Sequence, residues 1–113
     1  MKIVIEAIPM SVMRYGTLGD WFKKNDTLHI QVADHVSKDE QWLIALHEMV
    51  EAHFCERDGV TEGDVDAFDF TYTGQGEPGD DPKAPYRVQH RKAMIIEHMA
   101  AQMLGLDAYG TIE

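Results

Sequence analysis

Cysteine and basic residues are both scarce in this chain. Cys55 is the only cysteine in 113 residues, so no internal disulfide can form, which is typical of proteins from reducing compartments. Lys and Arg total 10 against 20 Asp and Glu, giving a formal net charge of −10. Because such a surface repels polyanions, we expect neither nucleic acid nor an anionic membrane as a partner.

Long apolar runs are absent as well. No stretch is long enough to span a bilayer, and the first residues, MKIVIEAIPM, lack the layout of a signal peptide. We therefore expect a cytoplasmic protein with no membrane partner. Hydrophobic residues make up 44% of the chain, which is ordinary for a folded protein, and the length suits one core. A single domain over residues 1–113 is the prediction.

The first third of the chain predicts two strands. Residues 2–8 are largely β-branched and apolar, and residues 27–32 alternate between apolar and polar side chains, as in a half-buried strand. Between them, residues 10–22 contain two glycines and predict a turn-rich connection. Trp21 and Phe22 would attach that connection to the core.

One long helix is predicted between Ser37 and Gly59. Ser37, with Glu40 three residues later, forms a capping-box pattern, and glycine suits the left-handed residue that ends a helix. At ~100° per residue, His47 and Glu51 lie ~40° apart. The same sector carries apolar side chains: Leu43, Ile44, Phe54 and Cys55. A carboxylate there needs a partner, either a metal ion or a neighbouring cation.

The next stretch predicts a short helix and a loop. Thr61 to Asp64 suits a helix start, and residues 65–70 could form one or two turns. The aspartates there resemble a calcium loop, but Phe68 stands where an oxygen ligand is needed, so we expect no calcium site. Residues 71–85 are rich in glycine and proline and are expected to form a loop.

A second helix is predicted from Pro85 to Leu104. His90 and Glu97 lie at the centre of its apolar face, within ~20° of each other. Three small residues flank them and would allow close approach to another helix: Ala93, Ala100 and Ala101. His98 follows the polar side and is a weaker candidate.

Two helices thus each direct one histidine and one glutamate from an apolar face. The pattern predicts a shared polar site formed by His47, Glu51, His90 and Glu97. Either a metal ion or a buried hydrogen-bond network could satisfy these groups.

The segment LIALHEMVEAHF, residues 43–54, resembles the active helix of the zincins, the His-Glu-x-x-His metallohydrolases. Residues 27–32 resemble the strand that precedes that helix, and residues 97–104 resemble the helix whose glutamate completes the zinc site in the gluzincin branch. Small uncharacterised phage and prophage proteins with a His-Glu-x-x-Glu helix are similar too. The resemblance implies a small zincin-like α+β domain, with a short N-terminal β-sheet packed on two long helices that carry the metal site.

Glu51 stands where the zincin pattern has its second histidine. Carboxylate oxygen binds zinc but also suits manganese or magnesium. The resemblance therefore implies a divalent metal, zinc first, held by His47, Glu51 and Glu97. His90 would add a nitrogen ligand, or would bind a second ion together with Glu97. Glu48 would be the catalytic base that takes a proton from the attacking water.

We accordingly predict a metal-dependent, peptidase-like hydrolase acting on an unknown peptide or protein. The alternative is a non-catalytic metal- or protein-binding phage protein that keeps the zincin scaffold. A third interpretation is an all-helical nucleotide pyrophosphatase that holds magnesium through Glu48 and Glu51, but the strand-like start argues against it.

Overall fold

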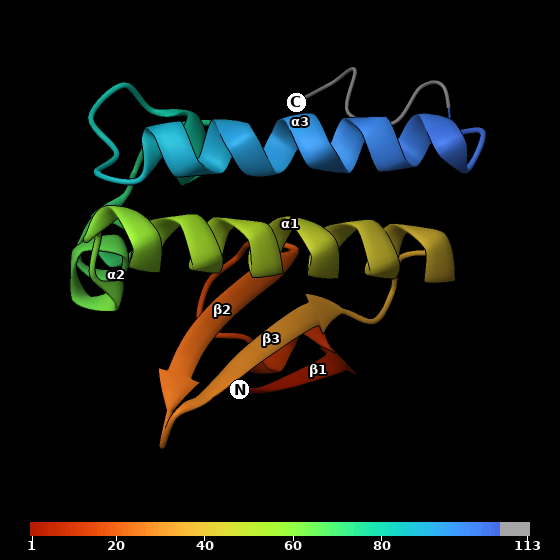
Figure 1. Cartoon of the computed structure of the whole chain (residues 1–113), viewed down its shortest axis with the longest axis horizontal. Coiled ribbons are helices and arrows are strands. Elements are labelled where there is room, and N and C mark those ends of the chain that lie inside the picture. Colours follow the sequence, from red (N-terminus) through yellow and green to blue (C-terminus); the bar gives the residue numbers. More distant parts are fainter. Residues whose placement is uncertain (107–113) are drawn as a thin grey trace.

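A three-stranded sheet and three helices make up the α+β domain of the computed structural model, which describes residues 1–106 (Figure 1). The strands are β1 (Lys2–Ile8), β2 (Gly19–Lys24) and β3 (Thr27–Ala33), in the order β1-β3-β2. β1 runs parallel to β3, and β2 runs antiparallel to it. The predicted strands over residues 2–8 and 27–32 are confirmed, and the sheet excludes the all-helical interpretation.

The strand β2 was not expected. Residues 10–22 form the single-turn helix η1 (Met10–Val12) and the first part of β2, so their prediction as a turn-rich connection is wrong from Gly19 onward. β2 forms because a two-residue turn folds the chain back so that residues 19–24 pair with β3. Asn25 and Asp26 both adopt positive φ, 53° and 62°, which is the backbone of the tight hairpin turn that joins antiparallel strands.

The long helix is α1 (Lys38–Asp58), and its predicted ends are confirmed. The Ser37 side chain accepts a hydrogen bond from the Glu40 backbone N–H at 3.2 Å, and Gly59 ends the helix with φ 76°. The second hydrogen bond of the capping box, expected from the Ser37 backbone N–H to the Glu40 carboxylate, is replaced by one from the Ser37 hydroxyl. The Glu40 carboxylate accepts from the Ser37 hydroxyl at 3.2 Å.

The helix α1 lies between the sheet and α3 (Arg87–Met103), so the domain has three layers (Figure 1). α1 contacts β2 and β3 on one side and α3 on the other. The sheet therefore packs on α1 rather than on two helices as expected. This happens because α1 buries side chains on both sides: Leu43, Ile44, Ala45, His47, Glu48, Glu51, Ala52 and Cys55.

The short helix is α2 (Glu62–Thr71), which confirms the helix predicted over residues 65–70. Thr61 and Asp64 form a complete capping box at its start. The loop predicted over residues 71–85 begins one residue later and contains a single-turn helix, η2 (Pro78–Asp80). Among the helices of residues 1–106, none combines the length and apolar character that crossing a bilayer requires.

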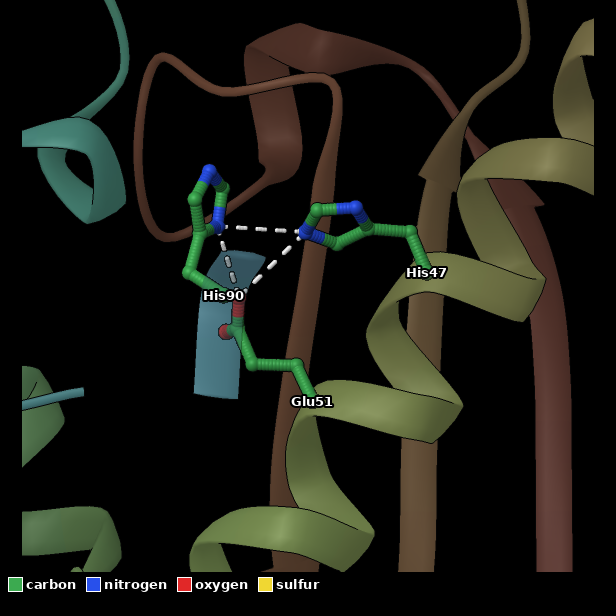
Figure 2. A group of neighbouring side chains, drawn as sticks. All are labelled: His47, Glu51 and His90. Carbon is green, nitrogen blue, oxygen red and sulfur yellow. Dashed lines mark hydrogen bonds and ion pairs between the residues drawn. The ribbon is translucent and has the colours of Figure 1, made fainter. Parts of the chain in front are cut away.

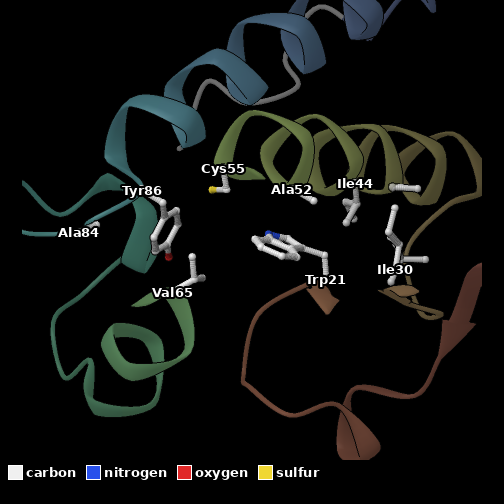
Figure 3. Close-up of a cluster of buried hydrophobic side chains, with 10 residues drawn as sticks. Trp21, Ile30, Ile44, Ala52, Cys55, Val65, Ala84 and Tyr86 are labelled. Atoms are coloured by element: carbon white, nitrogen blue, oxygen red, sulfur yellow. The ribbon is translucent and has the colours of Figure 1, made fainter. Parts of the chain in front are cut away.

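The apolar core lies beneath α1, where Trp21 of β2 packs between the sheet and the helices (Figure 3). Cys55 is fully buried there, which confirms its prediction as a small core residue. On α3, Ala93 and Ala101 are buried as well, which fits the expected close approach of that helix. The core cluster comprises Trp21, Ile30, Val32, Ile44, Ala45, Ala52, Cys55, Val65, Ala84 and Tyr86.

Gly19 lets β2 approach α1 closely. A Cβ at this position would lie 2.6 Å from Cγ2 of Ile44 and 3.0 Å from Cγ of Glu48. We expect Gly19→Ala to lower the free energy of unfolding by about 1–3 kcal/mol, because the helix or the strand must move. Chemical denaturation measures this loss. Gly16→Ala is the matched control, since a Cβ there meets nothing within 4 Å. Equal stability of the two variants would contradict this packing.

Candidate metal centre

His47 and Glu51 lie one turn apart on the face of α1 that meets α3. The Nε2 atom of His47 is 3.3 Å from Oε2 of Glu51. The other carboxylate oxygen, Oε1, accepts a hydrogen bond from the indole N–H of Trp21 at 3.0 Å. Trp21 therefore fixes the Glu51 carboxylate from the sheet side and leaves Oε2 directed toward the histidines.

His90 brings the third group from α3 (Figure 2). Its Nδ1 is 2.9 Å from Oε2 of Glu51 and 3.2 Å from Nε2 of His47. All three residues are buried, and one ligand atom from each lies within 4.8 Å of the others. The sequence prediction that the two helices meet at a shared polar site holds for these three residues.

Glu97 lies on the opposite side of the His47 ring. Its Oε1 is 2.7 Å from Nδ1 of His47. A carboxylate at Nδ1 keeps a proton on that nitrogen, so the ring donates to Glu51 through Nε2 when protonated and would offer the Nε2 lone pair to a metal ion once that second proton is lost. The structure thus brings Glu97 to the site as a neighbour of His47. Neither group of three ligand atoms found among residues 1–106 includes Glu97 or the half-buried His98.

Glu48 faces the same point from the next position on α1. Its Oε2 is 3.8 Å from Nε2 of His47, and its side chain is almost fully buried. Burial, together with the charge of Glu51, raises the pKa of Glu48 well above its ordinary value. A carboxyl group with a raised pKa can take and return a proton near neutral pH.

The charges of the cluster balance one another. Burial favours the neutral form of Glu51, but hydrogen bonds from His47 and His90 outweigh it and lower its pKa to about 2. Burial likewise favours neutral His47, yet Glu51 and Glu97 raise the pKa of this ring well above 6.5. The pKa of His90 is raised against burial chiefly by Glu51. The site therefore attracts positive charge, whether protons or a metal ion.

A cavity of about 80 Å³ opens beside these side chains. The site residues His47, Glu48, Glu51, His90 and Glu97 all line it. The lining also includes residues that sequence reasoning did not place at the site. Among them are Gly19, Asp20 and Trp21 of β2, Glu77 just before η2, and Pro78 and Gly79 of η2. Their contribution depends on which distant segments pack together, and no local pattern in the sequence indicated it.

No protein-family model, curated protein or solved structure matches the chain. The zincin resemblance therefore stays a prediction.

The free energy of unfolding of the chelator-treated protein should fall as pH rises from about 6 to 9. His47 and His90 have raised pKa values, so their protonation stabilises the fold below 6.5, and this stability is lost as pH rises through the folded values. The raised pKa of Glu48 acts in the same direction. The lowered pKa of Glu51 acts oppositely, but only as pH falls from 4.5 to about 2.

Thermal unfolding across this pH range measures the slope. His53→Gln is the control, because His53 is exposed on the same helix and its loss should leave the slope unchanged. A metal-free protein whose stability stayed level or rose with pH would contradict these protonation states.

Proposed function

We propose that the chain binds a divalent metal ion between His47, Glu51 and His90. The observation that carries this proposal is the convergence of three buried ligand atoms, from two helices, within 4.8 Å. Two imidazole nitrogens with one carboxylate oxygen form a ligand set suited to zinc. Manganese or magnesium are the alternatives, because a carboxylate oxygen also suits harder ions.

The neighbouring groups support this assignment. Glu97 holds the Nδ1 proton of His47, and Trp21 holds the distal oxygen of Glu51. Such partners keep ligand atoms in one orientation, and they are a regular part of metal sites. We therefore give Glu97 the role of positioning His47. The His-Glu-x-x-Glu helix follows a sheet, and a glutamate lies on a later helix. We therefore keep the zincin-like scaffold as part of the proposal.

For the reaction, we propose hydrolysis with Glu48 as the general base. A divalent ion bound here would polarise a carbonyl oxygen and lower the pKa of a water molecule. Glu48 lines the cavity beside His47 and would accept the proton of the attacking water, then pass it to the leaving group. Its raised pKa suits both transfers.

A peptide or protein is the proposed substrate. The resemblance of the His-Glu-x-x-Glu helix to the zincins supports this choice, and Gly19, Asp20 and Trp21 of β2 line the cavity beside Glu48. The peptide would reach Glu48 through this cavity, because the outer edge of β2 is already occupied. Its Gly19 and Trp21 carbonyls accept hydrogen bonds from Thr17 and Arg14, and the Lys23 N–H donates to Glu62.

A non-catalytic role is the second candidate, and the size of the cavity favours it. At about 80 Å³, the cavity beside the cluster is small for a peptide substrate. In this role the ion would join α1 to α3 and contribute to folding directly, and the scaffold would bind a protein partner.

Zinc should stabilise the protein through His47. At a free concentration about one hundred times its Kd, zinc is expected to raise the free energy of unfolding by about 2.7 kcal/mol. His47→Ala should abolish this gain, whereas His53→Ala, an exposed histidine of the same helix, should keep it. Metal analysis and thermal unfolding test both variants. An identical response of the wild type and His47→Ala to zinc would refute the proposed centre.

Glu48→Gln separates the two candidate functions. The variant should retain zinc, yet cleave a quenched fluorescent peptide library about 10²–10⁴-fold more slowly than the wild type. Glu56→Gln is the control, because Glu56 is exposed on the same helix and pairs with Lys23. A loaded wild type that cleaves no peptide would favour the non-catalytic role, and unchanged cleavage by Glu48→Gln would exclude this residue as the base.

A further inference from the structure

The second ring nitrogen of His90 has no hydrogen-bond partner. Its Nε2 is completely buried, and the whole residue is only 3% exposed. Figure 2 shows this nitrogen on the side of the ring that faces away from His47 and Glu51. A buried polar atom without a partner is rare in folded proteins, so its surroundings call for an explanation.

Two carboxylates converge on that nitrogen from η2 and the residue before it. Oδ1 of Asp80 is 3.2 Å from Nε2 of His90, and Oε2 of Glu77 is 3.4 Å from it. Neither carboxylate meets the geometry of a hydrogen bond to this nitrogen, so Nε2 remains unsatisfied. The three atoms lie within 4.8 Å of one another. Both carboxylates are partly exposed, at 46% for Glu77 and 40% for Asp80, so an ion can reach them from solvent.

Gly79 holds this arrangement together. A Cβ at this position would lie 2.5 Å from Cγ and Nδ1 of His90, so only glycine lets the η2 backbone lie this close to the ring. The close approach is what carries the acidic side chains on either side of Gly79 to the ring edge. The cluster is therefore built by backbone packing and is more than two acidic side chains that happen to share a surface.

We propose that Glu77, Asp80 and Nε2 of His90 form a second divalent-cation site. Two carboxylate oxygens and one imidazole nitrogen suit manganese as well as zinc. A cation would give the buried nitrogen a partner and offset the repulsion between the two carboxylates.

The two sites share one ring. The Nδ1 of His90 faces the centre at His47 and Glu51, and its Nε2 faces the new site. When both nitrogens bind cations, the ring has given up its N–H proton to water or buffer. The second site shares His90 with the proposed function but needs neither His47 nor catalysis, so the two proposals can fail separately.

Manganese binding to the metal-free full chain tests the second site, with free Mn²⁺ followed by electron paramagnetic resonance. The wild type should bind two ions per chain, and Glu77→Gln/Asp80→Asn should bind one. Glu6→Gln/Asp39→Asn is the matched control, because it removes two exposed carboxylates elsewhere and should still bind two ions. His47→Ala should lose the ion at the first centre and keep the other.

The outcomes separate the two proposals. If the wild type binds one ion that is lost in His47→Ala but kept in Glu77→Gln/Asp80→Asn, the second site is overturned, and the two carboxylates serve only to hold the ring. One ion lost in Glu77→Gln/Asp80→Asn but kept in His47→Ala would support the second site and refute the first. If the double variant fails to fold, Asp80→Asn alone replaces it and should likewise bind one ion.

Discussion

The buried carboxylate of Glu51 is the constraint on which the rest of the arrangement depends. A carboxylate in the interior of a protein is costly unless donors or cations surround it. Each layer of the domain supplies one such group: Trp21 from the sheet, His47 from α1 itself and His90 from α3. The carboxylate therefore joins all three layers at one point, and removing any one donor leaves part of it unsatisfied.

This convergence also explains why the helices carry so few large apolar side chains where they meet. Small residues such as Ala93 and Ala101 bring the backbones close, and the polar groups fill the remaining space. Buried polar networks of this kind specify one arrangement, because a shift of either helix would break several contacts at once. Glu97 extends the network by one step, since it holds the far side of the His47 ring.

Much of this was readable from the sequence, because helix periodicity and capping are local. Ser37 and Gly59 predicted the ends of α1, and the shared face of His47 and Glu51 predicted a polar site against a second helix. The strand β2 was missed, since its turn at Asn25 and Asp26 lacks the glycine that usually marks a hairpin. The contribution of Trp21 and Glu77 depends on which distant segments pack together, and no local pattern encodes that. The side of the His47 ring that Glu97 approaches follows from side-chain geometry, which residue spacing does not fix.

Gly79 has a consequence for how the interior communicates with the surface. The peptide backbone rests directly on the imidazole ring of His90, so the ring cannot tilt toward the solvent while this turn stays closed. Any event that lifts the turn, such as the docking of another molecule on its outer side, would free the ring and loosen its contact with Glu51. The turn thus couples the surface near Gly79 to the buried Glu51 carboxylate through the position of the His90 ring.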